Sequence, residues 1–255
     1  MNVLISIKKT IRYSQRFEGQ LTEEQLFERL IGNKIYKKEE LNQFVKLKSL
    51  SSLSSNNENK VFEEKIEKAK ELAKKISEKF KDVLFLGITG SVAAGYPKKD
   101  DDIDIVMITK INKLWITRLK LRSFIMINKI PHRKFGKREK KDEFCFNLWL
   151  DEESLLLPIR KQNLRSAMDL ILMKPIINND KTYEKFIMAN NWVKKYVATG
   201  YSLKPSAPQL RGTFLDREVL FDKVVNWLVF WPQFWYMKKR IKNEKVGLHK
   251  AFFHR

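Results

Sequence analysis

The stretch that decides the fold reads Leu86-Gly-Ile-Thr-Gly-Ser-Val-Ala-Ala-Gly-Tyr-Pro-Lys-Lys-Asp-Asp-Asp-Ile-Asp-Ile-Val-Met-Ile108. Its pattern predicts a strand, a sharp turn, a short helix and a second strand. Gly90 allows the backbone to turn tightly and to approach a ligand closely. Ser91 opens the short helix, whose free N–H groups and positive dipole end can hold a phosphate, and its hydroxyl can add one more donor. The turn is therefore a candidate phosphate-binding site.

Two aspartates follow this turn, after a gap of ten residues. Side chains alternate along a strand, so Asp102 and Asp104 are expected on one face, about 6.6 Å apart at ~3.3 Å per residue. Ile103 and Ile105 then point into the core. Two carboxylates at this separation can share a pair of Mg²⁺ ions, which lie ~3.5–4 Å apart in two-metal phosphoryl-transfer sites. Mg²⁺ prefers such hard oxygen ligands.

Helices and strands alternate on both sides of this stretch. Apolar residues repeat at helical spacing from Phe62 to Phe80, and a short strand is predicted at 83–86. After the Ile103–Ile108 strand, a helix is expected at about Leu114–Ile127 and a strand at Phe144–Leu150. This order predicts an α/β or α+β sheet domain.

The N-terminal 48 residues predict three short helices. Thr22 and Gln25 have the spacing of a capping box at the start of the second one. Such a unit is typical of a helix-turn-helix or winged-helix module, although a small helical cap on the next domain explains it equally well. The Ser/Asn-rich segment 49–60 is the best domain boundary. We expect three regions: 1–58, helical and winged-helix-like; 59–175, the sheet domain; and 176–255, helical and basic.

The net charge of +21 is concentrated in two segments. Residues 110–141 hold twelve Lys or Arg and one acid, for +11, and residues 237–255 hold seven bases and one acid, for +6. Such a field favours a polyanionic partner such as RNA, DNA or a nucleotide triphosphate. A solvated basic surface is the equal alternative, because charge alone names no partner.

The remaining composition indicates a cytoplasmic protein. The single cysteine, Cys145, cannot form an internal disulfide, which favours a reducing compartment. The N-terminus lacks the pattern of a secretory signal. The most apolar stretch, 224–237, is too short to cross a bilayer, so no membrane partner is expected.

Thr89-Gly90-Ser91 followed after ten residues by Asp102-Ile103-Asp104-Ile105 resembles the signature of the polymerase-β nucleotidyltransferase superfamily, in particular its minimal nucleotidyltransferase branch. The resemblance implies an α+β fold with a mixed sheet and flanking helices. It also implies that Gly90 and Ser91 bind the triphosphate of an incoming nucleotide, and that Asp102 and Asp104 are catalytic Mg²⁺ ligands. A nucleotidyl group would then pass from an NTP to an acceptor hydroxyl.

The family usually has a third carboxylate on a later strand, and this chain departs from that pattern. By alternation, Cys145, Asn147, Trp149 and Asp151 are expected to share one face of the 144–150 strand. Asn147 corresponds to the third carboxylate but is neutral. Three readings stay open: Asp151 reaches the metal, Asn147 coordinates through its amide oxygen, or catalysis is weak or absent.

Two functions follow from these residues. The first is a Mg²⁺-dependent nucleotidyltransferase that uses an NTP, with RNA favoured over DNA as acceptor because of the basic segments. The second is a nucleotidyltransferase-fold module that has lost turnover and binds nucleotide or nucleic acid, for which Asn147 is the main support. A purely DNA-binding regulator would leave Asp102 and Asp104 without a purpose.

Overall fold

The computed structural model describes residues 2–17, 21–45, 56–133, 140–205, 217–238, 241 and 245–253. The expected Ser/Asn-rich joint falls mostly on residues outside these ranges. The helices are α1 Val3–Gln15, α2 Glu23–Glu28, α3 Lys38–Val45, α4 Asn56–Lys79, α5 Gly90–Ala94, α6 Leu114–Ile127, α7 Leu164–Leu172, α8 Thr182–Ala189, α9 Lys194–Ser202 and α10 Arg217–Lys238. The strands are β1 Val83–Thr89, β2 Ile103–Thr109, β3 Phe144–Asp151, β4 Lys174–Asn178, β5 Lys245–Val246 and β6 Lys250–Phe252.

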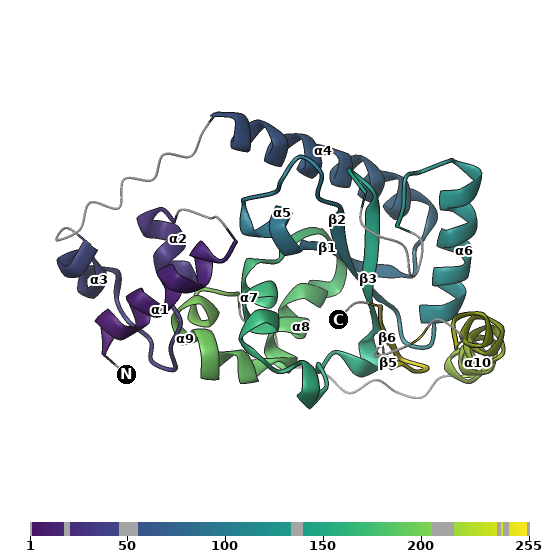
Figure 1. Cartoon of the computed structure of the whole chain (residues 1–255). Coiled ribbons are helices and arrows are strands. Elements are labelled where there is room, and N and C mark those ends of the chain that lie inside the picture. Colours follow the sequence, from purple (N-terminus) through teal and green to yellow (C-terminus); the bar gives the residue numbers. More distant parts are fainter. Residues whose placement is uncertain are drawn as a thin grey trace.

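A mixed six-stranded sheet forms the centre of the molecule, in the order β4-β1-β2-β3-β6-β5 (Figure 1). Strands β2 and β3 run parallel, and the other neighbouring pairs are antiparallel. The expected α+β architecture is therefore confirmed. Strand β4 begins at Lys174 and so crosses the expected boundary at 175.

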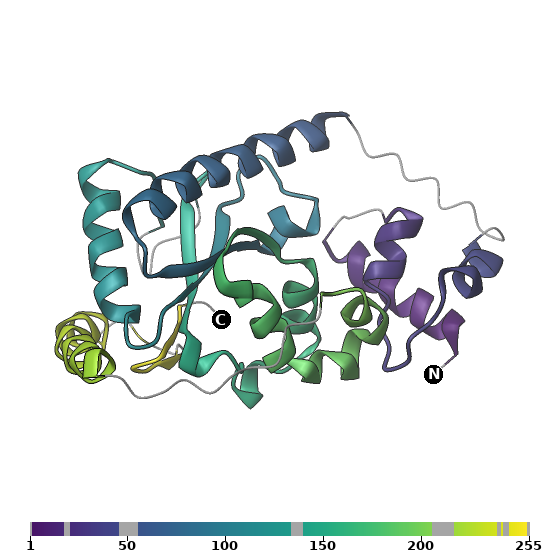
Figure 2. The same ribbon diagram turned by 180° about the vertical axis from the view of Figure 1, so that it is seen from behind.

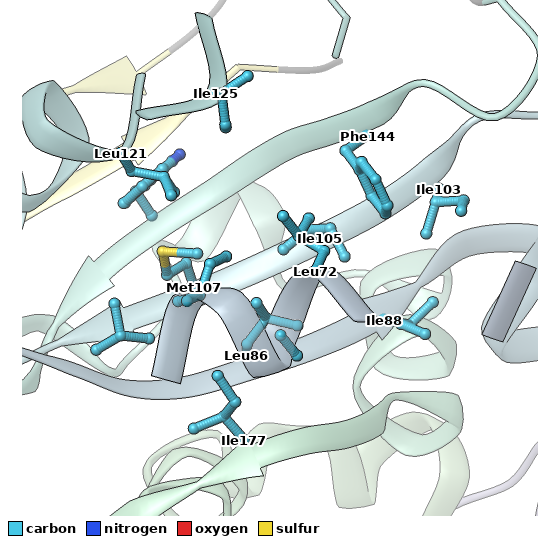
Figure 3. Packing of buried hydrophobic residues seen from close by; sticks show 14 of the residues in the cluster. Leu72, Leu86, Ile88, Ile103, Ile105, Met107, Leu121, Ile125, Phe144 and Ile177 are labelled. Carbon is cyan, nitrogen blue, oxygen red and sulfur yellow. The ribbon is translucent and has the colours of Figure 1, made fainter. Parts of the chain in front are cut away.

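Helices cover both faces of this sheet (Figure 2). On one face, α4, α6 and α10 bury the side chains of Leu86, Ile105 and Met107, as the close view shows (Figure 3). On the other face, α7, α8 and α9 pack against Phe85, Val106 and other side chains of opposite parity. Side chains of β2 point alternately to the two faces, so Asp104, two residues before Val106, points toward the α7 side.

The N-terminal unit consists of three helices with a small core of their own. Thr22 and Gln25 form the expected capping box. The described residues 2–17 and 21–45 contain no strand pair of their own. Instead, Gly32 pairs with Val197, the residue at the kink within α9, so that this unit is joined to the core by a backbone bridge.

The C-terminal region contains the expected helix, α10, and two strands that the sequence did not predict. Helix α10 continues through Pro232. Strand β6 then pairs with β3 and so extends the central sheet. Among the described residues, no helix combines the length and apolarity needed to span a bilayer.

Candidate active site

The glycine turn contacts the second aspartate directly. Gly90 has φ +69°, a conformation that other residues rarely adopt, and begins the five-residue helix α5. A Cβ at this position would lie 2.4 Å from Asp104 Oδ2. Thr89 pairs with Asp104 in the β1–β2 ladder. Only glycine can therefore occupy position 90 while Asp104 keeps its place.

The two predicted aspartates converge. Asp102 lies immediately before β2 and is buried, and Asp104 lies on the strand. Ligand atoms of Asp102, Asp104 and Cys145 all lie within 4.8 Å of one another. Cys145 joins the group because it pairs with Asp104 across the parallel β2–β3 ladder.

Asn147 also contacts the pair. Its Nδ2 donates a hydrogen bond of 2.9 Å to Asp104 Oδ1. The β2–β3 register shifts here: Phe146 pairs with Ile105, but Leu148 pairs with Val106. This bulge adds one residue to β3, so the expectation that Trp149 shares a face with Asn147 was wrong. Trp149 packs in the core on the α4 side.

Asp151 lies at the far end of β3 and does not reach Asp104. It pairs with Thr109, six residues beyond Cys145 and therefore roughly 20 Å along the strand. Its Oδ2 accepts hydrogen bonds from the Asn112 backbone N–H at 3.2 Å and from His249 Nδ1 at 2.8 Å. These bonds raise the pKa of His249 and tie the β6 segment to β3. Asp151 is a structural residue.

Ser91 contacts Asp101, an acid outside the Gly90-Ser91 and Asp102/Asp104 motif. Its hydroxyl donates a 2.6 Å hydrogen bond to Asp101 Oδ2, and the Lys98 backbone N–H donates to the same oxygen at 2.9 Å. The loop between α5 and β2 is therefore folded back onto the start of α5. Lys98 and Lys99 line an adjacent hollow of about 530 Å³ together with Tyr96, Lys60 and Lys141.

Two residues of the site could not be found from the sequence motif. Arg133 donates a 3.1 Å hydrogen bond to Asp102 Oδ2, and the only signal for it was its place in a basic segment. Asp169, on α7, acts on Asp104 electrostatically. Burial raises the pKa of Asp104 to about 7, and the negative charges of Asp102 and Asp169 add to this effect. Burial raises the pKa of Asp169 itself to about 6.

The side chains present fit a hard divalent cation. Mg²⁺ is commonly held by one or two carboxylates, with waters and substrate phosphates completing its shell. Asp102 and Asp104 supply those carboxylates, whereas Asn147 turns its amide N–H toward the pair. Cys145 offers a soft sulfur rather than the oxygen that Mg²⁺ prefers, and burial and the two neighbouring carboxylates raise the pKa of its thiol.

A family model described as "Nucleotidyltransferase domain" matches residues 69–165. These residues form a nucleotidyltransferase domain. The domain runs from the second half of α4 to the first turn of α7 and holds the whole Gly-Ser turn and both aspartates. No curated protein and no solved structure gave a significant match to this chain.

The N-terminal helices, most of α7 and the C-terminal elements lie outside the matched residues. The nucleotidyltransferase domain nevertheless contacts the N-terminal unit closely. Arg29 of the α2 C-terminus donates a 2.9 Å hydrogen bond to the Ala94 carbonyl at the end of α5, and its guanidinium stacks over Tyr96. The N-terminal unit, which lies outside the matched residues, is thereby attached to α5 beside the glycine turn.

Proposed function

We propose that the protein is a Mg²⁺-dependent nucleotidyltransferase that moves a nucleotidyl group from an NTP to an acceptor hydroxyl. The observation that carries this proposal is the convergence of Asp102 and Asp104 against the Gly90 turn, within a nucleotidyltransferase domain. When bound, the metal would neutralise phosphate charge and polarise the α-phosphoryl group. Asp102 and Asp104 would hold it.

The triphosphate would lie on the turn at Gly90 and Ser91. Ser91 already directs its hydroxyl toward Asp101, so binding of a phosphate requires this hydrogen bond to be exchanged for one to the phosphate oxygen. Lys98 and Lys99, in the hollow next to this bond, are placed to balance the charge of the β- and γ-phosphates.

Asp169 is the acid we propose as general base in place of the missing third carboxylate. Its pKa of about 6 leaves it ionised at neutral pH but able to take a proton. The acceptor oxygen would bond to the α-phosphorus while the bond to the pyrophosphate oxygen breaks. Pyrophosphate would leave, and the hydroxyl proton would pass to Asp169.

RNA is the acceptor that the charge of the chain favours. Part of the basic 110–141 segment has structural roles, however. Arg118 is buried, donates a 2.6 Å hydrogen bond to Gln233 Oε1 and stacks on Phe253, and Lys113 pairs with Asp222. Other cations must therefore make most of the contacts to a polyanion.

The test is transfer of label from α-labelled NTPs to total RNA in the presence of Mg²⁺. Wild-type protein should label RNA, and Asp104→Ala should reduce the rate by at least about 10³-fold, because it removes a ligand of the charge-stabilising metal. Glu71→Gln, an exposed acid on α4, is the matched control and should transfer at the wild-type rate. Transfer by Asp104→Ala at the wild-type rate would refute the proposal.

The second candidate is a module that binds nucleotide without turnover. The specific observation in its favour is the neutral Asn147 at 2.9 Å from Asp104. It predicts that Mg²⁺ and an NTP together raise the melting temperature while no labelled product forms. The same preparations, measured by thermal denaturation and by label transfer, separate the two candidates.

A further inference from the structure

A hollow lies between the N-terminal helices and the helices on the α7 side of the sheet. It is bordered by α1, by the start of α7 and by α9, which lie together in both ribbon views (Figure 1, Figure 2). Its volume of about 640 Å³ is within the range of pockets that bury small ligands. The side chains that reach into this α1–α9 hollow include Lys9, Arg12, Tyr13, Arg16, Lys195 and Tyr196.

The hollow is strongly cationic. Lys9, Arg12 and Arg16 follow one another at helical spacing, so they form a single stripe along α1. Lys195 of α9 adds a fourth cation from the opposite wall. No acidic side chain lines the hollow within the described part of the chain. Arg12, Arg16 and Lys195 are exposed and form no ion pair with any residue that the structure describes.

The two walls are held in fixed positions by backbone hydrogen bonds. The Gly32 N–H donates to the Tyr196 carbonyl at 2.7 Å, and the Ala198 N–H donates to the Gly32 carbonyl at 2.8 Å. The Ile31 N–H donates to Thr10 Oγ1 of α1 at 2.9 Å. Cations from both walls, Arg12, Arg16 and Lys195 among them, are thus held around one concavity that no acidic side chain of the described residues lines, an arrangement that stabilises a bound polyanion.

Two aromatic rings are interleaved with the cations. Tyr13 and Tyr196 are both half-buried and line the hollow. A groove that tracks phosphates with cations and offers aromatic faces to bases is typical of proteins that bind single-stranded nucleic acid. We propose that the α1–α9 hollow binds the sugar–phosphate backbone of a single-stranded nucleic acid, with Tyr13 and Tyr196 as stacking surfaces.

Helix α7 links the hollow to the aspartate side of the sheet. Leu164 at its start lines the hollow, Asp169 lies five residues later on the same helix, and α7 packs against α5, which begins at Gly90. A strand held in the hollow could present its terminal hydroxyl at Asp104. This assignment of the strand as acceptor rests on the proposed function, whereas binding of the strand does not.

The experiment measures binding of a labelled 20-nucleotide single-stranded RNA by fluorescence anisotropy, without NTP or metal. The triple variant Arg12→Gln, Arg16→Gln, Lys195→Gln should bind at least tenfold more weakly. The slope of log affinity against log salt concentration should become less steep by about 2. Three phosphate contacts are lost, and each contact to a single strand contributes about 0.7 to that slope. The melting temperature shows that the variant is folded, and Lys195→Glu alone, on the opposite wall, should also weaken binding.

The matched control removes three exposed cations from the other side of the molecule: Lys74→Gln, Lys75→Gln, Lys120→Gln on α4 and α6. It should bind within about twofold of wild type if the contacts are local. Equal losses in both triple variants, or no loss in the first, would overturn the proposal. Tighter binding of duplex DNA than of single strands would also overturn it. So would displacement of the RNA by ATP, together with weaker ATP binding to the first triple variant, because the hollow would then hold a nucleotide.

A last comparison keeps this inference separate from catalysis. Asp104→Ala should bind the RNA as wild type does, because Asp104 does not line the hollow. Absence of transfer by the wild type, with RNA binding that still depends on Arg12, Arg16 and Lys195, would refute the transferase and leave the binding site standing. Single-stranded DNA of the same sequence shows whether the 2′-hydroxyl contributes.

Discussion

Asn147 donates its amide N–H to Asp104 Oδ1 at 2.9 Å, and thereby occupies the place beside the pair where a third carboxylate would lie. Asn147→Asp should therefore supply that carboxylate. We expect divalent-cation affinity to rise by about tenfold, since affinity increases with the number of charged ligands. Calorimetric titration with Mg²⁺ or Mn²⁺ measures it. Asn147→Ala, which loses the hydrogen bond and adds no charge, should show no gain; an equal gain in both would contradict this role.

Gly90→Ala should lower the rate of transfer strongly while it lowers stability only modestly. Its φ of +69° costs an alanine about 1–2 kcal/mol, and the new Cβ would meet Asp104 Oδ2 at 2.4 Å. Displacement of a ligand by about 1 Å can lower a rate 10²-fold. Gly95→Ala is the control, because φ is +87° but the nearest atom to its Cβ is Gln25 Nε2 at 3.8 Å. Label transfer by both variants at the same rate would refute the steric argument.

The pKa of Asp104 predicts how the metal-free protein responds to pH. Its folded-state pKa is raised from 3.8 to about 7, so between these values the folded state binds more protons than the unfolded chain. The free energy of unfolding should therefore fall as pH rises through this window. Thermal denaturation in EDTA at pH 5 and pH 8 measures it. In Asp104→Asn the free energy of unfolding should fall less between pH 5 and pH 8. If it fell as much as in the wild type, Asp104 would not be the buried acid responsible.

Removing the charge of Asp169 should make metal binding possible at lower pH. The Asp169 carboxylate raises the pKa of Asp104, and a metal ion binds only the deprotonated form. In Asp169→Asn the pH at which metal affinity is half-maximal should be lower than in the wild type. The transfer rate should fall, because the proposed base is lost. Glu184→Gln, on α8, serves as control. A midpoint that stays in place would show that the two carboxylates do not interact.

Asp151→Ala should damage stability and leave metal binding intact. The substitution leaves the buried Asn112 N–H without its acceptor, and leaves the partly exposed His249 with Glu153 Oε2 at 3.5 Å. A loss of about 1–3 kcal/mol is expected when a buried donor loses its acceptor. Denaturant unfolding measures the loss, and calorimetry on the folded protein measures Mg²⁺ affinity. A loss of Mg²⁺ affinity without loss of stability would show that Asp151 acts at the metal site.

The sequence was sufficient for the local features that depend on short spacing. Gly90, Ser91, Asp102 and Asp104 lie within one strand–turn–helix–strand segment, where backbone geometry fixes the position of each side chain. The capping box at Thr22 and Gln25 was predictable for the same reason. Each depends on residues a few positions apart, so that chain connectivity alone places them.

Only the tertiary structure decided which distant residues complete the site. Alternation along β3 correctly placed Asn147 beside Asp104, but one extra residue in β3 turned Trp149 into the core on the other face, which alternation alone could not foresee. Asp169 and Arg133 come from a helix and a loop that reach the aspartates through sheet packing. The α1–α9 hollow likewise exists because the bridge between Gly32 and Val197 joins segments far apart in the chain. Long-range packing, not local spacing, brings these charges together.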